Sequence, residues 1–415
     1  MVKMKTNINK DMRLFDVDFL PGKWRITKLG DISFVTKLAG FEYTKHFDSY
    51  KVNGEIIVIR GINITNNKLD TSDVKTIPKR VSDLLPRSKL NKGDLTFAYV
   101  GTIGPVFLID QNNKYHLGPN TAKISPSDDV DPRYMFQYFT SNLIRREINE
   151  NISVGAQPSL SMKKIRSFNI ILPPHIEQQK IATALSDMDD LIESLEKIIE
   201  KKKKIKQGTM QQLLTGKKRL PGFSGEWKIV KVDDFGSIVT GGTPATRSEE
   251  YWNGDIPWVT PTDITNRKNI LKTGRMITQK GIETINKLPA KTVLVTCIAS
   301  IGKNAILMQE GACNQQINAI IPNDNYNSDF LYYLMENNKN YLKSKAGITA
   351  TNIISKQTFS EIEFLVPNIK EQQAIAEILS DMDAEIEALE EKLKKYKKLK
   401  EGMMQELLTG RIRLV

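Results

Sequence analysis

The chain has few of the residues that metal sites and disulfide frameworks use. Its 415 residues include only two cysteines, Cys297 and Cys313, and three histidines, His46, His116 and His175. The cysteines form no CxxC pair and the histidines show no metal-ligand spacing, so we interpret all five as ordinary packed or surface residues. The sequence therefore argues against a disulfide scaffold and a zinc ribbon, and it predicts no metal site.

Long apolar runs are also missing. The sequence has no apolar stretch of about 18 residues, and no apolar segment of a signal peptide follows its charged N-terminus. The 60 Lys and Arg residues exceed the 48 Asp and Glu residues, which gives a formal net charge of +12. A basic balance of this size favours a polyanion partner. We expect a soluble cytoplasmic protein without a membrane segment.

Familiar catalytic motifs are absent as well. The segment around Lys303 resembles a P-loop, but Cys297 replaces its first glycine and Asn304 replaces its Ser or Thr. The glycine turn 239–244 lacks the GxGxxG spacing of a dinucleotide site. No Asp/Asn-Pro-Pro-Tyr/Phe segment of an amino-methyltransferase occurs, and spacing alone identifies no nuclease carboxylate pair. The sequence therefore predicts a chain without a catalytic centre.

A duplicated segment is the most informative feature that is present. Residues 173–220 and 367–414 align without a gap at an offset of 194, and 28 of the 48 aligned positions are identical. Unrelated sequences would share about three. Both copies contain Glu-Gln-Gln, Leu-Ser-Asp-Met-Asp and Leu-Leu-Thr-Gly. The chain therefore contains an internal repeat.

Both copies have the pattern of a long helix. Apolar residues recur in steps of 4 and 3, which predicts the seam of a coiled coil. Asn368 and Glu371 have capping-box spacing, and Gly216 and Gly410 suit the position that ends a helix. Such a stripe could also pack on the core of its own domain, but its strict period favours pairing of the two copies. The seam positions are Ile181, Leu185, Met188, Ile192, Leu195, Ile199, Ile375, Leu379, Met382, Ile386, Leu389, Leu393 and Tyr396.

The connection between the two helices predicts their orientation. Segment 221–366 leaves the end of the first helix and returns to the start of the second. The termini of a compact domain usually lie close together. Parallel helices would force this domain to span about 45 Å, the length of roughly 30 helical residues. We therefore expect an antiparallel pair that separates two globular domains, with an approximate twofold axis.

The rest of the chain divides into a polar N-terminal tail, 1–20, and two domains, 21–172 and 221–366, before the helical spacers 173–220 and 367–415. Short β-like runs separated by Gly, Asn and Pro predict an α+β fold with a mainly antiparallel sheet in each domain. Single helical runs are expected at 133–150 and 328–345. The domains match weakly but in order, so they share a fold while most of their surface residues differ. The helices therefore serve one shared purpose, and the domains serve two different ones.

Polar residues in the loops of both domains are candidates for nucleic-acid contact. Arg, Asn and Gln suit the edges of guanine and adenine, whereas Lys, Ser and Thr suit phosphate. For any single residue, ordinary surface polarity is the simpler interpretation. The predicted DNA-binding residues are Arg60, Asn63, Lys79, Arg80, Arg87, Lys89, Thr102, Asn120, Thr240, Thr243, Arg247, Thr262, Ser300, Lys303, Asn304, Gln315 and Gln316.

The duplicated helices and several loop phrases resemble one known family. With Glu-Gln-Gln, Ser-Asp-Met-Asp and Leu-Leu-Thr-Gly in both copies, the chain is similar to the specificity subunit of type I restriction-modification systems. The segment 218–223 with Trp227, the Gly-Gly-Thr-Pro at 241–244, and Asn314-Gln315 resemble that family's target recognition domains. The resemblance covers essentially the whole chain, although the first domain has no obvious Gly-Gly-Thr-Pro counterpart.

The resemblance implies a division of labour. Each target recognition domain would read one half of a bipartite, asymmetric site on double-stranded DNA. The paired helices would set the spacing and dock two methyltransferase (M) subunits, which recruit restriction (R) subunits. S-adenosylmethionine and ATP would bind those partners, so no cofactor is expected in this chain. Two alternatives stay open: a coiled-coil scaffold that does not bind DNA, and an enzyme whose carboxylates the sequence does not pair.

Overall fold

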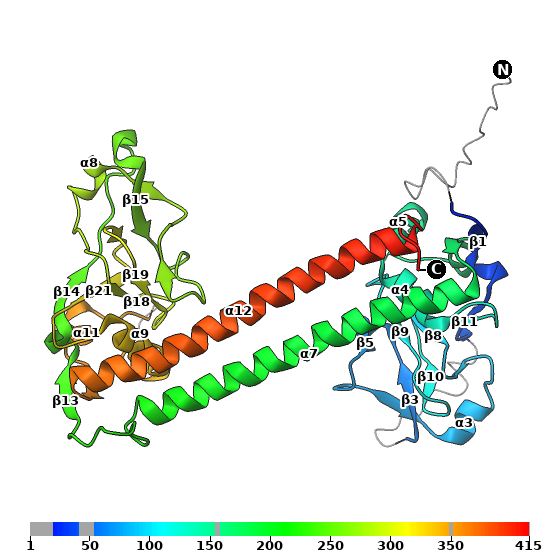
Figure 1. The fold of residues 1–415 in the computed structure, drawn as a ribbon, viewed down its shortest axis with the longest axis horizontal. Helices are drawn as coiled ribbons and strands as arrows, with labels where there is room; N and C mark the ends of the chain where they lie inside the picture. Colours follow the sequence, from blue (N-terminus) through cyan, green and yellow to red (C-terminus); the bar gives the residue numbers. More distant parts are fainter. Residues whose placement is uncertain (1–19, 41–53, 154–157, 348–351, 415) are drawn as a thin grey trace. The chain divides into compact units, whose positions relative to one another are not determined.

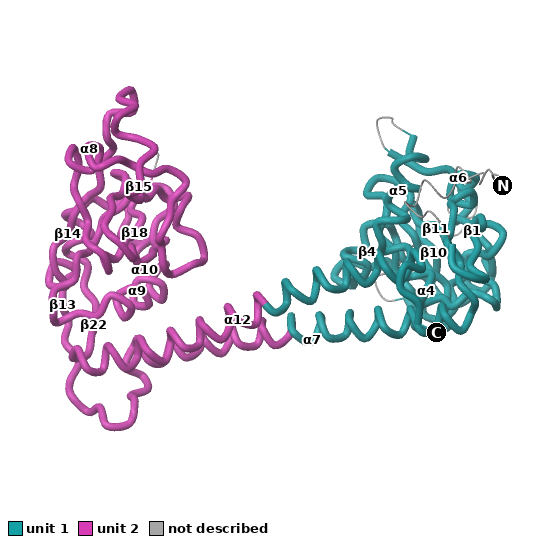
Figure 2. Tube along the Cα trace, turned by 45° about the horizontal axis from the view of Figure 1, so that its top comes forward, with its two compact units in different colours: residues 1–196, 392–415 teal, residues 197–391 magenta. Residues whose placement is uncertain are grey.

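The computed structural model describes residues 20–40, 54–153, 158–347 and 352–414. His46 and nearly all of the polar tail lie outside these ranges. The chain forms two compact units: unit 1 contains residues 1–196 and 392–415, and unit 2 contains residues 197–391 (Figure 2). Each unit therefore contains one globular domain and part of each long helix.

The described residues of unit 1 form two four-stranded sheets and a terminal ribbon. One sheet has the order β2-β11-β8-β9 (Ser33–Lys37, Thr121–Pro126, Leu95–Ala98, Val106–Leu108), and the other has the order β6-β3-β10-β7 (Lys75–Ile77, Ile56–Ile59, Tyr115–Leu117, Lys89–Leu90). The ribbon pairs β1 (Arg25–Lys28) with β12 (Asn169–Leu172), and a short hairpin pairs β4 (Ile64–Thr65) with β5 (Lys68–Leu69). The short helices are α3 (Lys79–Asp83), α4 (Pro132–Thr140), α5 (Asn142–Asn151) and α6 (Met162–Arg166), with 3-10 turns η1 (Leu29–Asp31) and η2 (Gly61–Asn63).

Unit 2 repeats this plan with a larger first sheet. That sheet has the order β14-β21-β18-β19-β16 (Gly236–Thr240, Ile317–Pro322, Thr292–Thr296, Asn304–Leu307, Asn269–Ile270), and the second has the order β17-β15-β20 (Met276–Ile277, Trp252–Val259, Ala312–Cys313). The ribbon pairs β13 (Lys228–Lys231) with β22 (Glu363–Val366). The short helices are α8 (Gln279–Ile282), α9 (Ser328–Asn337), α10 (Lys339–Ser344) and α11 (Lys356–Ser360), with 3-10 turns η3 (Val232–Phe235) and η4 (Glu249–Tyr251).

The two units share a topology, as the weak sequence match predicts. Strand β3 pairs in parallel with β10 in unit 1, and β15 pairs in parallel with β20 in unit 2, while most other strand pairs are antiparallel. The same tight turn follows β8 and β18: the amide of Gly104 donates to the carbonyl of Ala98, and the amide of Gly302 donates to that of Thr296. The predicted α+β class with mainly antiparallel sheets is confirmed.

The two helical runs that the sequence predicts are each broken into two helices. In unit 1 the break falls at Ser141, whose side chain accepts a hydrogen bond from the amide of Leu143 and so caps a new helix. In unit 2 it falls at Asn338, whose side chain donates to the carbonyl of Leu334 at 2.8 Å. Both predicted runs are helical, but the sequence pattern did not locate the break in either, because the apolar period continues across a short polar residue that satisfies backbone groups itself.

The long helices are α7 (His175–Leu213) and α12 (Ile369–Leu408). Gly216 and Gly410 follow their ends with φ of 68° and 74°, the left-handed conformation that glycine adopts most easily. At the start of α12, the side chain of Asn368 accepts a hydrogen bond from the amide of Glu371 at 3.1 Å. The reciprocal half of the predicted capping box is wrong, because the Glu371 carboxylate binds Arg219 instead.

In unit 1 the segments of α7 and α12 lie side by side and run antiparallel (Figure 1). Asp189 pairs with Lys400 at 2.6 Å, and Glu196, seven residues later, pairs with Lys397 at 2.6 Å. The residue number of the partner on α12 falls as the residue number on α7 rises, which shows that the two helices are antiparallel. The core of this unit includes Leu407 and Leu408 from the end of α12.

Unit 2 contains the complementary segments in the same arrangement. Lys203 pairs with Glu390 at 2.5 Å, and Lys206 pairs with Asp383 farther toward the start of α12. Met210, Leu213 and Leu214, from the end of α7 and the residue after it, join the core of this unit. The predicted antiparallel orientation is therefore confirmed within each unit.

Every predicted seam position is buried or half-buried. The first seam residues of each helix belong to the core of a globular domain: Ile181 and Leu185 in unit 1, and Ile375 and Leu379 in unit 2. The two interpretations of the stripe therefore both apply. Its first turns pack on the helix's own domain, and later ion pairs join it to the other helix.

Candidate nucleic-acid interface

A buried ion pair joins the globular domain of unit 2 to its helices. The Arg219 guanidinium donates to both carboxylate oxygens of Glu371 at 2.7 Å, and the Trp227 indole donates to the same carboxylate at 3.3 Å. Only 1% of the Glu371 side chain is exposed. Because Arg219 follows α7, Glu371 begins α12 and Trp227 begins the domain, this contact ties three parts of the unit together.

Unit 1 contains the same three-residue contact. Glu177 at the start of α7 binds the guanidinium of Arg413, which follows α12, and the indole of Trp24 donates to the same carboxylate. Arg413 corresponds to Arg219 at the repeat offset of 194. The first residue of each Glu-Gln-Gln motif therefore serves as an anchor.

The first glutamine of each motif fixes the helix to a short helix of the domain. The Gln178 side chain accepts from the amide of Asp131 at 2.8 Å and donates to the carbonyls of Pro173 and Asp129. Asp131 is the N-cap of α4. In unit 2 the same three bonds join Gln372 to Asn327, Pro367 and Asn325. The second glutamine, Gln179 or Gln373, is exposed, so only it faces away from the domain.

Most of the residues predicted in the second domain meet at one edge of the five-stranded sheet. The order of this sheet brings together the end of β14, the start of β21, the end of β18 and the start of β19. The hydroxyl of Thr243 donates to the Gln315 side chain at 2.7 Å across two loops at this edge. The other predicted residues of this edge are Thr240, Ser300, Lys303, Asn304 and Gln316. We call it the loop edge of unit 2.

Several of these residues are already engaged within the unit. Asn304 is 3% exposed and donates to Glu336 of α9 at 3.0 Å. Thr240 donates to Asn318 at 2.8 Å. Thr243, Arg247, Thr262, Lys303 and Gln315 are exposed. DNA contact by this exposed group stays a prediction, whereas the bond to Glu336 commits Asn304 to packing.

The predicted residues of the first domain are less concentrated. Asn63 is 3% exposed and accepts from the side chain of Arg60, which also pairs with Asp73 at 3.2 Å. Both side chains therefore hold the η2 turn rather than project from it. Thr102 and Asn120 are exposed at the edge where β8 ends and β11 begins.

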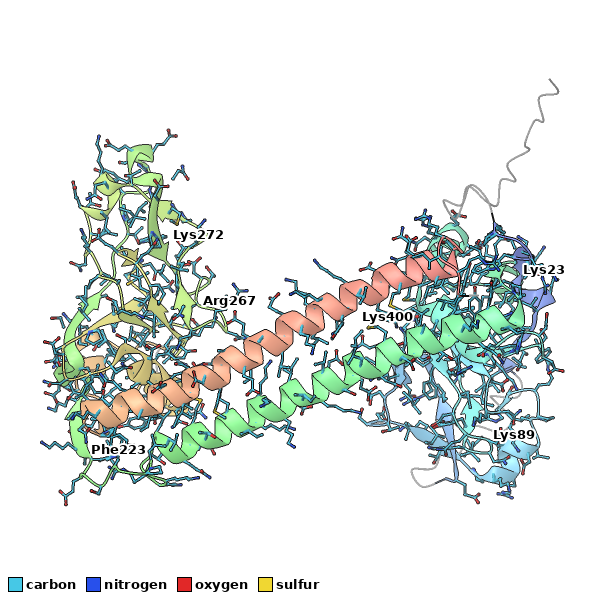
Figure 3. All side chains as sticks on the ribbon, in the orientation of Figure 1. Lys23, Lys89, Phe223, Arg267, Lys272 and Lys400 are labelled. Atoms are coloured by element: carbon cyan, nitrogen blue, oxygen red, sulfur yellow. The ribbon has the colours of Figure 1, made fainter. Side chains whose placement is uncertain are left out.

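The other predicted basic residues of the first domain lie on α3 and in the segment that follows it. Lys79 and Arg80 are exposed on α3. Arg87 donates to the hydroxyl of Thr36 at 3.1 Å, and Lys89 pairs with Asp83 at 2.7 Å. Whether they contact DNA stays a prediction. Figure 3 shows the position of Lys89 in this domain.

Sequence reasoning missed two tryptophans and an arginine beside the loop edge of unit 2. Trp252 and Trp258 pack edge to face, with ring centroids 5.1 Å apart, and the guanidinium of Arg275 lies 3.6 Å from the Trp252 ring. The available signal was two of the chain's four tryptophans within one short segment. That signal does not identify Arg275, which the pairing of β15 with β17 brings to the rings.

The glycines of the Gly-Gly-Thr-Pro phrase permit close packing at this edge. A Cβ atom on Gly241 would lie 2.2 Å from the carbonyl oxygen of Asn314 and 2.3 Å from that of Cys313. The Gly242 amide donates to the Cys313 carbonyl at 2.8 Å. A side chain at Gly241 would therefore separate the two loops.

Metal-ligating side chains and thiols are the remaining chemical groups of interest. Within the described ranges, no group of His, Cys, Asp and Glu side chains could hold a metal ion, and no helix is long and apolar enough to cross a membrane. Burial raises the pKa of Cys297 to about 11 and that of Cys313 to about 12. Both thiols are therefore protonated and unreactive at neutral pH.

Comparison with known proteins gives a consistent result. A specificity subunit of a type I restriction enzyme from Methanocaldococcus jannaschii, MjaIX, is 38% identical over 168 residues, 39% of each chain. A second subunit from that organism, the putative MjaX, is 24% identical over 424 residues and 96% of each chain. The crystal structure of the S subunit of a type I restriction-modification system from M. genitalium matches with a TM-score of 0.60 at 14% identity, over 98% of both chains.

A family-level match covers most of the chain. The pattern of the type I restriction modification DNA specificity domain matches twice, at residues 21–207 and 224–398. Each match contains one globular domain and most of the long helix that follows it. Because the two matches together cover far more than half of the sequence, the chain belongs to the type I restriction-modification DNA specificity family.

Proposed function

We propose that this chain is the DNA sequence-specificity subunit of a type I restriction-modification complex. Each globular domain binds one half of a bipartite, asymmetric DNA site, and the paired helices set the spacing of the halves. One observation carries the proposal. The two units share their helix anchors, Glu177 and Glu371, but differ in the loops at the edges of their sheets.

The partners follow from the same division. The exposed faces of the duplicated helices present similar surfaces, which suits two copies of one partner. We propose that these partners are methyltransferase subunits, that restriction subunits join through them, and that the complex acts in the cytoplasm. S-adenosylmethionine and ATP bind those subunits, and this chain contributes recognition without catalysis.

Mapping of methylated bases tests the proposal. A strain that expresses this chain with its methyltransferase subunit is compared with a strain that lacks the chain. The expected result is methylation at a split sequence with an unspecific gap. Exchange of residues 221–366 for the corresponding domain of a relative should alter one half-site and leave the other unchanged. A continuous site, or methylation that does not depend on this chain, would contradict the proposal.

A further inference from the structure

We propose that Arg275 is a specificity-determining residue of the second domain and reads a guanine base with the free edge of its guanidinium. This inference rests on the proposed DNA recognition and goes further, because it assigns one base contact to one residue. Arg275 precedes β17 and is exposed, and the two tryptophans beside it are nearly buried, Trp252 at 8% and Trp258 at 4%.

The geometry holds the guanidinium by its face. Its central carbon lies 3.6 Å from the centroid of Trp252 and 5.2 Å from that of Trp258. The two rings are perpendicular, at 85°, so they fix each other. Stacking uses the flat face of a guanidinium and leaves its N–H groups at the edge free to donate. Arg275 is therefore oriented before any ligand binds.

Among the residues that the structure describes, none forms an ion pair or a hydrogen bond with the N–H groups of the Arg275 guanidinium. Two arginines that stabilise the fold pair with carboxylates: Arg219 binds Glu371 through two bonds, and Arg60 binds Asp73. What distinguishes Arg275 is that its guanidinium is held by tryptophan rings and not by a carboxylate.

The tryptophans connect Arg275 to the loop edge of unit 2. The Trp258 indole donates to the carbonyl of Gly242 at 2.9 Å, and the Trp252 indole donates to that of Ala245 at 3.2 Å. Between these two carbonyls lies Thr243, which binds Gln315. Arg275 therefore belongs to the same rigid group of loops that presents Thr243 and Gln315.

The chemistry of a stacked arginine favours guanine. The guanidinium presents parallel N–H groups, and in the major groove guanine offers two acceptors, O6 and N7, at matching spacing. Phosphate also accepts two such bonds, but it carries no sequence information. A lysine keeps the charge but has neither the planar fork nor the stacking face. Substitution by lysine therefore separates base recognition from simple charge attraction.

The corresponding described positions of the first domain do not form this arrangement. In unit 2 the amide of Trp258 donates to the carbonyl of Arg275, so these two residues face each other across β15 and the segment before β17. In unit 1 the equivalent strands β3 and β6 pair Val58 with Lys75, which therefore occupy the corresponding positions. Val58 offers no ring for stacking, and Lys75 lies 3.9 Å from Asp73. The guanine contact is therefore specific to the half-site of the second domain.

The test uses the full chain assembled with its methyltransferase subunit, in three variants: R275A, R275K and, as a matched control, K272A. Lys272 is an exposed cation three residues away on the same connecting loop, and Figure 3 shows it on unit 2. Methylated sites are mapped for each variant, and binding is measured on DNA with each base of the half-site substituted. Thermal unfolding checks that each variant folds.

Both R275A and R275K should lose the preference for guanine at one position of the second half-site, by roughly tenfold or more. K272A should retain every base preference, even if it binds all sequences more weakly. Unchanged preferences in folded R275K, alongside a split site for the unaltered chain, would overturn the role of Arg275 and leave the proposed function standing. If the complex with the unaltered chain methylates no defined site, both the role of Arg275 and the proposed function would be overturned.

Discussion

The two units use the same contacts to join domain to helix and different residues at the edges of their sheets. Glu177 and Glu371 each bind an arginine and a tryptophan indole at corresponding places. In contrast, Trp258 and Arg275 of unit 2 occupy positions where unit 1 has Val58 and Lys75. The duplicated sequence therefore preserves the attachment of each domain, while the loops vary.

This comparison changes the meaning of the duplicated Glu-Gln-Gln motif. Its glutamate and first glutamine are buried and bind the motif's own unit. They therefore cannot contact a partner subunit without breaking that unit. Identity between the copies reflects intramolecular attachment at these positions, and only the exposed second glutamine is free for docking.

The largest expected effect comes from removal of the buried glutamate of unit 2. Glu371→Ala leaves the Arg219 guanidinium and the Trp227 indole without their acceptor. Loss of one partner of a buried ion pair typically costs several kcal/mol. We expect about 2 to 3 kcal/mol for Glu371, since its partner retains some solvent contact. Chemical denaturation, with hydrogen exchange to distinguish the units, measures this loss.

Glu177→Ala in unit 1 is the matched comparison. The side chain of its partner Arg413 is 36% exposed, against 27% for Arg219, so solvent replaces the lost contact more readily. We therefore expect a smaller loss for Glu177→Ala, confined to exchange in unit 1. Equal losses, or protection lost throughout the chain, would contradict the view that each anchor serves its own unit.

The second expected effect is a pH dependence of the unfolding free energy that a buried histidine of unit 1 causes. The two described histidines, His116 and His175, lie in unit 1, and His116 is fully buried beside the hydroxyl of Ser82, 3.0 Å from its Nδ1. Burial lowers the pKa of His116 to about 4, with smaller contributions from the charges of Lys123 and Lys89. The folded state therefore resists protonation more than the unfolded chain, whose histidine has a pKa near 6.5.

Stability should consequently fall as the pH falls from about 6.5 to about 4 and be unaffected by His116 above that range. The resulting loss of unfolding free energy is at most about 3.5 kcal/mol, because one pKa unit corresponds to about 1.4 kcal/mol. Denaturation of the chain and of His116→Gln across this range gives the difference due to this residue. An equal acid sensitivity in both proteins would remove His116 as the cause.

Local sequence pattern predicted the parts of the fold that depend on local physics. The 4 and 3 spacing located the helices, and the positive φ of Gly216 and Gly410 follows from glycine's freedom at a helix end. The antiparallel orientation required only the connectivity of the chain. These features depend on neighbouring residues or chain length, which a sequence shows directly.

The surroundings of the candidate contact residues depend on distant parts of the chain, which a local pattern does not show. Asn63 was predicted as a DNA contact at the end of a strand, and in the structure its side chain is buried and its amide donates to the backbone carbonyls of Asp70 and Asp73. Glu371 was assigned to a capping box, although its partner Arg219 is 152 residues away. Such pairings are set by strand register and tertiary packing, which no local period reveals.

The smallest expected effect concerns the glutamine bonds to the short helices. Gln372→Ala removes one acceptor and two donated bonds. The amide of Asn327 and the carbonyl of Asn325 are close enough to solvent to regain water, whereas the carbonyl of Pro367 is buried. The net contribution of one such bond is about 0.5 to 1.5 kcal/mol. We expect roughly 1 to 2 kcal/mol for Gln372→Ala and a similar value for Gln178→Ala, measured by denaturant unfolding.

The exposed neighbour provides the control for both units. Gln373→Ala and Gln179→Ala should leave stability nearly unchanged, because these side chains are exposed in their own units. If instead they weaken assembly with the methyltransferase subunit while Gln372→Ala does not, the motif divides into inner residues for attachment and an outer residue for docking. A stability loss at Gln179 or Gln373 that equals the loss at Gln372 would erase that distinction, since it would place all three side chains in the attachment of the domain.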